Sequence, residues 1–455
     1  MKLHTHPTRG DEHAQAPTRR TGTGSPARNI AGSLAIGLVL ALVLVAVVFP
    51  GATESVVTGS ILVAFGVGWG ALAALTSRRT SQAQPWARVP AAAMGVTGLA
   101  LIVFRPQNEV LTLLNWVWPP LLLALVVWMF RQMRRSLTGR GRWLLTPMLV
   151  ALALAAIGGT TADVSELRIA HEYAAAPGAT YLVNGHRLHL DCRGSGSPTV
   201  VLFSGLGEFS QSWTGVTQQV NRTTRVCAYD RAGQGWSDDV STPQDGLTAA
   251  HDLHTLLAAA GEHGPYVLVG HSIGGPYALT YAAQYPEQVA GMVLLDSSSP
   301  QQMTEIANYS SQYPIMRRGL ALLPTLTRIG LGRFLGTGAG LPGNAGAEVQ
   351  AMTSTARSAR NGRDEVSILP RLFEESQALT TLQAKPLEVV TASENLGTGG
   401  WSATQDRLTA LSSNHRHIVV QSSHEGLLME LTGAIASAHA IDDVVAAVRR
   451  SSPVR

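Results

Sequence analysis

Hydrophobic residues follow two different patterns along the chain, and the change between them falls near residue 163. Before that point, long uncharged apolar runs recur, each close to the roughly 20 residues that a helix needs to cross a bilayer. After it, short apolar runs alternate with amphipathic stretches, as strands and helices do in an α/β domain. The sequence therefore predicts an all-α membrane region followed by an α/β domain with a mainly parallel sheet.

Five apolar runs predict five membrane-spanning helices after a polar tail. Residues 1–28 are rich in Arg, Pro, Gly and Thr, which predicts a disordered cytoplasmic tail. A cleaved signal peptide is disfavoured, because the first run is long and further spans follow it. We expect the transmembrane region to cover residues 29–163, with a kink in the fourth span at Pro119-Pro120. The expected spans are approximately 30–49, 56–76, 89–104, 111–130 and 143–161.

The basic residues predict how the membrane region is oriented. Thirteen Lys and Arg residues lie in the tail and in the loops after the second and fourth spans, whereas the opposite loops contain only Arg105. Basic residues accumulate on the cytoplasmic side of membrane proteins. We therefore expect a multi-pass protein of the cytoplasmic membrane, with a cytoplasmic N-terminus and an extracytoplasmic α/β domain. Since the basic excess lies in the membrane region, it gives no reason to expect a nucleic-acid partner.

Eight short apolar or alternating runs predict the strands of the α/β domain. The first two are joined by Asn184-Gly185, which is typical of a type I′ hairpin turn. A long, mostly helical stretch at 300–383 separates the sixth run from the seventh. The expected strands are Thr180–Val183, His186–Asp191, Thr199–Phe203, Thr224–Tyr229, Tyr266–Val269, Gly291–Leu295, Leu387–Thr391 and His417–Val420.

The fifth strand runs into Gly270-His271-Ser272-Ile273-Gly274, the G-x-S-x-G pattern of a nucleophile elbow. A turn this sharp from strand to helix strains the backbone at the serine, and the flanking glycines remove Cβ atoms that would collide. The Ser272 hydroxyl is then expected at the carboxyl edge of the sheet. The backbone N–H of Ile273, at the start of a helix, is expected to point to where an oxyanion forms.

Residues 173–450 resemble the α/β-hydrolase fold family in the order and spacing of five elements. These are the hairpin, Ser204-Gly205-Leu206-Gly207, Asp230-Arg231-Ala232-Gly233-Gln234-Gly235-Trp236-Ser237, the Ser272 motif with Gly275, and Ser422-Ser423-His424-Glu425-Gly426. The resemblance implies a lid at 300–383 and a second oxyanion donor, the N–H of Leu206. The family usually has His-Gly where this chain has Ser204-Gly205, a departure that leaves a backbone donor in place.

The resemblance also implies a triad of Ser272, His424 and an acid. A serine hydroxyl is a weak nucleophile until a neighbouring base takes its proton, and His424 follows the last strand, where that base is expected. Two acids are possible. Most relatives place the acid after the seventh strand, where Asn395 stands beside Glu394, whereas dehalogenase-type relatives use the end of the sixth strand, here Asp296. We favour Asp296 and keep Glu394 as the alternative.

Three further residues near these motifs are given supporting roles. His271 is expected to be structural, because it is adjacent to Ser272 and points away from it. Asp230 and Arg231 are expected to brace the loops beside the site. The chain has no metal-ligand spacing, phosphate-binding loop or dinucleotide fingerprint, so neither a cofactor nor a metal is expected.

These features predict a membrane-anchored serine hydrolase of ester-type acyl bonds that acts on a small, apolar ester. An aminopeptidase- or amidase-type hydrolase is the nearest alternative, and a non-catalytic membrane sensor that keeps the hydrolase fold is another. An Asp nucleophile would indicate epoxide or halide chemistry, and Ser272 argues against both.

The chain has two cysteines, Cys192 after the second expected strand and Cys227 in the fourth. The resemblance implies that these strands are neighbours, and an exported domain is in an oxidising compartment. We expect a disulfide, with two separate buried thiols as the alternative.

Overall fold

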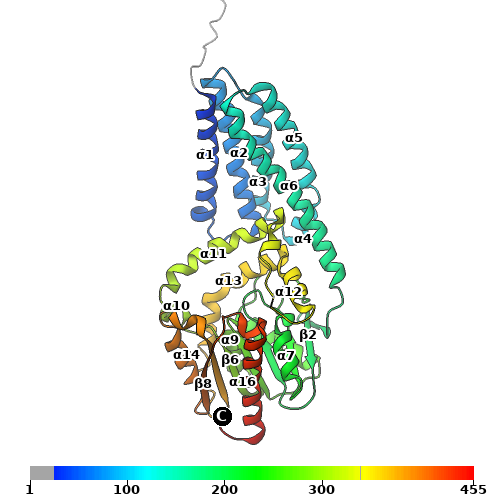
Figure 1. Ribbon diagram of the computed structural model, residues 1–455, viewed down its shortest axis with the longest axis vertical. Coiled ribbons are helices and arrows are strands. Elements are labelled where there is room, and N and C mark those ends of the chain that lie inside the picture. The colour runs from blue at the N-terminus through cyan, green and yellow to red at the C-terminus, as the bar shows by residue number, and fades with distance from the viewer. Residues whose placement is uncertain (1–24, 339, 455) are drawn as a thin grey trace, which may run out of the picture.

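The computed structural model describes residues 25–338 and 340–454, which form a bundle of long helices stacked on an α/β domain (Figure 1). Most of the expected tail, residues 1–28, lies outside the described residues, and Pro26 already begins the first helix. The bundle consists of α1 (Pro26–Val43) with η1 (Leu44–Val48), α2 (Glu54–Arg79), η2 (Pro85–Ala87) with α3 (Arg88–Phe104), α4 (Asn108–Asn115), α5 (Trp118–Ser136) and α6 (Arg140–Glu172).

Glycines let the first three helices of the bundle approach one another closely. A Cβ atom on Gly98 of α3 would lie 2.6 Å from the carbonyl oxygen of Gly59 in α2, and Gly37 of α1 packs against Gly68 of α2. Small residues of this kind are typical of helix contacts inside a membrane, where close packing replaces the hydrophobic effect.

Each of the five expected spans corresponds to helices long and apolar enough to cross a membrane. The fourth is two helices, α4 and α5, bent by 46° at a break just before Pro119-Pro120, the expected kink. A sixth apolar helix, α16 (Leu431–Arg450), meets the same criterion of length and composition. It packs on the sheet of the α/β domain through side chains such as Ile441 and Val444, so we assign it to that domain.

The last membrane helix is longer than its apolar run suggests. The sequence predicts a span that ends near residue 161, but α6 continues to Glu172. At 1.5 Å per residue its 33 residues extend roughly 50 Å, against a hydrocarbon core of about 30 Å. Its C-terminal turns therefore reach the α/β domain (Figure 1).

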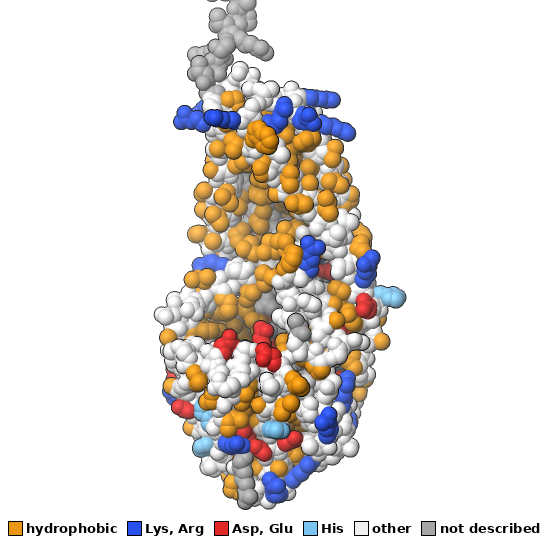
Figure 2. Space-filling model, viewed as in Figure 1, with side chains coloured by type: hydrophobic (Ala, Val, Ile, Leu, Met, Phe, Trp, Pro, Cys, Tyr) orange, Lys and Arg blue, Asp and Glu red, His pale blue; other side chains and the backbone are white. Residues whose placement is uncertain are grey.

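The surface of the bundle shows a broad apolar band (Figure 2). Lys and Arg side chains gather at the end of the bundle that lies away from the α/β domain, where α2 ends with Arg78 and Arg79 and α5 with Arg134 and Arg135. An apolar band with a basic rim on one side is the distribution expected of a membrane protein.

The α/β domain contains one eight-stranded sheet in the order β1-β2-β4-β3-β5-β6-β7-β8. β2 pairs antiparallel with both β1 and β4, and every other pair is parallel. All eight expected strands are present, and positive φ angles at Asn184 and Gly185 agree with the type I′ turn. The strands are β1 (Ala179–Val183), β2 (His186–Arg193), β3 (Val200–Phe203), β4 (Val226–Tyr229), β5 (Tyr266–His271), β6 (Val289–Leu295), β7 (Leu387–Ala392) and β8 (His415–Val420).

Helices cover both faces of the sheet. One core contains side chains of α8 (Gly246–Ala259), α9 (Gly274–Gln284) and α14 (Trp401–Thr409), whereas the other contains those of α7 (Thr214–Val220), α15 (Gly426–Met429) and α16. Strands β3, β5 and β7 are buried along their whole length, as strands covered on both faces are.

The insertion between β6 and β7 lies between the sheet and the membrane helices (Figure 1). It contains α10 (Gln302–Glu305), α11 (Tyr309–Leu326), η5 (Thr327–Leu331), η6 (Gly332–Phe334), α12 (Ala345–Thr353) and α13 (Ala356–Ser376).

Polar contacts attach this insertion to the bundle. Buried Arg328 of η5 forms an ion pair with Glu54, the first residue of α2. The Arg318 guanidinium of α11 donates to the carbonyl of Ala46 at 3.0 Å. Gly158 of α6 allows η5 to pack closely, because a Cβ there would overlap the carbonyl oxygen of Ile329.

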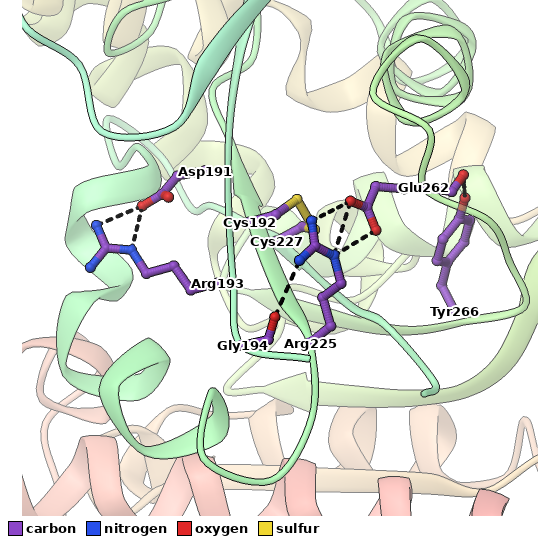
Figure 3. The surroundings of a disulfide bond; sticks show 8 residues. All are labelled: Asp191, Cys192, Arg193, Gly194, Arg225, Cys227, Glu262 and Tyr266. Atoms are coloured by element: carbon purple, nitrogen blue, oxygen red, sulfur yellow. Dashed lines mark hydrogen bonds and ion pairs between the residues drawn. A yellow bond between two sulfur atoms is a disulfide. The ribbon is translucent and has the colours of Figure 1, made fainter. Parts of the chain in front are cut away.

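The expected disulfide between Cys192 and Cys227 is confirmed (Figure 3). The two cysteines are register partners on the antiparallel strands β2 and β4. Beside the bridge, Arg225 is paired with Glu262 at 2.6 Å and also donates to the carbonyl of Gly194 at 3.2 Å. The bridge thus joins the antiparallel edge of the sheet to its parallel part.

Replacing both cysteines by serine should destabilise the α/β domain. The bridge closes a loop with a sequence separation of 35, for which the chain-entropy model gives about 4 kcal/mol. We expect the denaturant midpoint of the full chain to fall and to become insensitive to reductant. A wild-type midpoint that reductant does not change would contradict this account.

Candidate active site

Ser272 lies in a tight turn between β5 and α9, with a φ angle of +54°. This left-handed conformation is unfavourable for a residue other than glycine. The flanking glycines make the turn possible, because a Cβ on Gly270 would lie 2.6 Å from the Cα of Gly275 and one on Gly274 would overlap the carbonyl oxygen of Phe203. The structure therefore has the strand, turn and helix that the motif predicts.

Hydrogen bonds attach this turn to the next strand. The Ser272 N–H donates to the carbonyl of Leu295, at the end of β6, at 3.2 Å, and its carbonyl accepts from the N–H of Ser298 at 2.9 Å. Asp296 lies between these two partners, and it also has a positive φ angle, +40°. The ends of β5 and β6 are thus held side by side.

Asp296 and His424 are in direct contact. The Nδ1 atom of His424 lies 2.6 Å from Oδ2 of Asp296. The carboxyl group is fully buried, whereas the imidazole, in the loop between β8 and α15, is 29% exposed. An acid that accepts from Nδ1–H fixes the imidazole tautomer in which Nε2 is free to accept a proton.

Several donors surround the Asp296 carboxylate. Oδ1 accepts from the indole N–H of Trp401 at 3.0 Å and from the N–H of Ala392 at 3.1 Å. Burial alone would raise the pKa of Asp296, but the hydrogen bond and charge of His424 and the amide of Asn395 hold it below its ordinary value. The carboxyl group is therefore ionised at neutral pH.

The other candidate acid, Glu394, contacts the main chain instead of the imidazole. Its Oε2 accepts from the backbone N–H of His424 at 2.6 Å. The neighbouring Asn395 donates from Nδ2 to Oδ2 of Asp296 at 2.6 Å. The residue that stands at the usual acid position of the family thus supports the carboxylate at the end of β6.

The loop after β3 brings Leu206 to the Ser272 turn. A Cβ added at Gly205 would lie 3.1 Å from the Cβ of Ser272. Among the described residues, the backbone N–H groups of Leu206 and Ile273 have no hydrogen-bond partner. Two free N–H groups beside a serine are what an oxyanion hole requires.

Buried Arg231 braces this loop, as expected. Its guanidinium donates to the carbonyls of Ser204 at 2.5 Å and Gly205 at 2.9 Å. It also pairs with Glu365 of α13, which accepts from the N–H of Gly207 at 3.0 Å. Asp230 accepts from the N–H of Ser210 at 2.6 Å.

Glu208 is a buried acid with a role that the sequence analysis did not assign. Its Oε2 accepts from the N–H of Gly205 at 2.5 Å, and its Oε1 lies 2.9 Å from Nδ1 of His271. The Nε2 atom of His271 lies 3.0 Å from the carbonyl oxygen of His424. The only sequence signal was a charged residue in an otherwise apolar loop at a strand end.

The contacts of His271 favour a proton on each of its ring nitrogens. A carbonyl oxygen only accepts, so Nε2 carries a proton, and an ionised carboxylate also only accepts. Burial alone would lower the pKa of His271, but Glu208 and the His424 carbonyl raise it above its ordinary value. Burial alone would raise the pKa of Glu208, but His271 and the Gly205 N–H lower it. This ion pair joins the Gly205 loop to the His424 loop, the structural role expected of His271.

Among the described residues, one group has the spacing of metal ligands: Cys192, Cys227 and Glu262. The two sulfur atoms are joined in the disulfide, and Glu262 is paired with Arg225. These groups do not fit a metal, because a cysteine binds metals as a thiolate.

Comparisons with known proteins agree with the fold of this domain. Residues 198–319 match the family described as alpha/beta hydrolase fold. An uncharacterised protein of Schizosaccharomyces pombe is 33% identical over 192 residues, which cover 36% of this chain and 35% of the relative. An uncharacterised protein of Bacillus subtilis is 30% identical over 155 residues, which cover 34% of this chain and 46% of the relative. The chain thus spans about a third to a half of these relatives.

Among solved structures, the Cif epoxide hydrolase from Acinetobacter nosocomialis has a TM-score of 0.52 at 17% identity. The similar region covers 64% of this chain and 96% of that protein's chain. This likeness concerns the fold. Together with the family match, it confirms the expected resemblance: a domain of the α/β-hydrolase fold follows the helices that are long and apolar enough to span a membrane.

Replacing Glu208 by Gln should lower stability in a pH-dependent way. Because the pKa of His271 is raised on folding, its charge stabilises the fold fully at pH values below its unfolded pKa of about 6.5. This contribution is lost as pH rises through the folded-state pKa. Because the pKa of Glu208 is lowered on folding, its charge stabilises the fold fully at pH values above its unfolded pKa of about 4.5. This contribution is lost as pH falls through the folded-state pKa. We expect a loss of about 3 kcal/mol between these values, since one partner of a buried pair is removed.

Thermal melts of the full chain from acid to alkaline pH would measure this difference, with the exposed Glu287→Gln as the control. The loss in Glu208→Gln should shrink as pH rises above the folded-state pKa of His271. An equal loss at every pH would show that Glu208 acts by packing alone.

Proposed function

We propose that the chain is a membrane-anchored serine hydrolase of ester-type acyl bonds, with Ser272 as nucleophile, His424 as base and Asp296 as acid. The observation that supports this most is the 2.6 Å contact of Nδ1 of His424 with buried Asp296, next to the Ser272 turn. His424 also lies against the residue that precedes Ser272, since the rings of His271 and His424 are 4.7 Å apart.

The first half of the proposed reaction forms an acyl-enzyme. Oγ of Ser272 attacks the ester carbonyl carbon while Nε2 of His424 takes the hydroxyl proton. The N–H groups of Leu206 and Ile273 stabilise the negative charge that develops on the carbonyl oxygen. The ester C–O bond then breaks, and His424 gives the proton to the leaving alcohol.

The second half releases the acid. Water attacks the acyl carbon and loses a proton to His424, the bond to Oγ breaks, and the proton returns to Ser272. Asp296 stays ionised throughout and stabilises the imidazolium that forms twice in the cycle. An amide could follow the same steps, so an amidase-type activity is the second candidate.

The choice of acid can be tested with Asp296→Asn and Glu394→Gln in the detergent-solubilised full chain. Loss of the acid from a serine-protease triad lowers kcat by about 10⁴, and we expect a similar loss in Asp296→Asn. Glu394→Gln should stay close to wild type, because the amide oxygen can still accept from the His424 N–H. Turnover of a p-nitrophenyl ester measures both.

Circular dichroism and melting temperature would confirm that both variants are folded. Near-full turnover in Asp296→Asn together with a loss of several orders of magnitude in Glu394→Gln would make Glu394 the acid.

We further propose that the N-terminus is cytoplasmic and the hydrolase domain extracytoplasmic. The basic rim at the far end of the bundle supports this orientation (Figure 2). An alkaline phosphatase reporter fused after Glu172, where α6 ends, should be active, and a cytoplasmic reporter at the same place should be silent. The opposite pair of results would reverse the orientation.

A further inference from the structure

The C-terminal turns of α6 form one wall of a pocket of about 360 Å³ in the hydrolase domain. A second wall is the loop after β3, where Gly207, Glu208 and Phe209 line the pocket. The remaining walls come from the loop after β4 and from α12 and α13. Its volume lies within the range of small-molecule sites, about 300 to 1,000 Å³.

Two hydrogen bonds hold the C-terminal turns of α6 in place as a wall of the pocket. The carbonyl of Tyr173, at the end of α6, accepts from the indole N–H of Trp236 at 2.8 Å. Glu166 of α6 accepts from the backbone N–H of Ala356, at the start of α13, at 2.8 Å. The membrane helix is therefore an integral part of the pocket, held to both the sheet side and the lid side.

The pocket adjoins the loop that carries Leu206, one of the two proposed oxyanion donors, although neither Leu206 nor Ile273 lines it. Gly207 and Glu208 directly follow Leu206, and the carboxylate of Glu208 holds the N–H of Gly205, which lies against Ser272. A group bound in the pocket therefore lies next to the loop that would hold the carbonyl oxygen of a reacting ester.

The polar residues of the pocket are largely used to brace its walls. The Arg357 guanidinium donates to the carbonyls of Gly235 and Ser237, and the Asn361 amide donates to that of Gly233. The lining left to contact a ligand is mainly apolar. It includes Ile169 and Ala170 of α6, Met352 of α12, and the edge-to-face pair Phe209 and Trp236, whose ring centroids are 5.6 Å apart.

We propose that this pocket takes the hydrocarbon chain of the ester substrate, and that α6 thereby sets which chain lengths the enzyme accepts. The inference rests on the proposed ester hydrolysis. It gives the membrane region a role in specificity beyond anchoring, with Ile169 as a specificity-determining residue.

The test uses the detergent-solubilised full chain and p-nitrophenyl esters from acetate to decanoate. Ile169→Trp fills the pocket and should lower the decanoate-to-acetate ratio of kcat/KM by about tenfold or more, since each methylene in such a pocket is worth about tenfold. Leu167→Trp is the matched control, because Leu167 is on the same helix, is 59% exposed and does not line the pocket. It should keep the wild-type ratio.

Ile169→Ala enlarges the pocket and should shift the preference toward longer chains. If Ile169→Trp is inactive on acetate as well, the ratio measured for Ile169→Ala tests the pocket proposal. An unchanged decanoate-to-acetate ratio in Ile169→Ala, or in an Ile169→Trp variant that is active on acetate, would overturn the pocket proposal. Turnover of acetate in the same experiment would still support the proposed function. A wild type that hydrolyses no ester of the series would instead overturn the proposed function.

Discussion

The sharp turn at Ser272 is the constraint on which the arrangement of the hydrolase domain depends. Its left-handed backbone is possible because Gly270 and Gly274 carry no Cβ, and hydrogen bonds to Leu295 and Ser298 bind it to the end of β6. Those bonds place Asp296 beside the turn, and Asp296 in turn holds the imidazole of His424. The buried pair of Glu208 and His271 then fixes the loop of Leu206 against the loop of His424. A strained residue of this kind persists only where its surroundings hold it, and here all three surrounding loops do so.

The candidate membrane helices and the hydrolase domain form one packed structure. The ion pair between Arg328 and Glu54 is buried, and buried pairs are costly unless their geometry is maintained, so the insertion and the bundle are expected to keep a fixed relation. The extension of α6 completes this connection, because it carries Ile169 and Tyr173 from the membrane to the edge of the proposed site. A bilayer anchor alone would need neither the buried ion pair nor the extension of α6. This is the physical basis for assigning the membrane region a part in substrate selection.

Local patterns predicted the features that depend on few residues. The eight strands, the Asn184-Gly185 turn and the strand, turn and helix around Ser272 each follow from short runs of sequence, and the five spans follow from apolar length. The sequence favoured Asp296 over Glu394 as the proposed acid because Asn395 stands at the usual position, but it kept both, since both follow strands that end at the same edge of the sheet. The choice depends on which carboxylate faces the imidazole, and Asn395 turns toward Asp296 while Glu394 turns to the main chain. The length of α6 past residue 161 was missed, because its last turns are polar and their helix is stabilised by tertiary contacts such as that of Glu166 with Ala356.

The central claim is that Ser272 is a nucleophile activated by His424, which a non-catalytic sensor of the same fold would not have. The most direct measurement is mass spectrometry of the full chain after treatment with a fluorophosphonate, with the modified residue located by peptide mapping. The account predicts one adduct, on Ser272, that forms rapidly in the wild type and is abolished or strongly slowed in His424→Ala. Absence of an adduct on the folded wild type, or labelling of Ser272 at the same rate without His424, would contradict it.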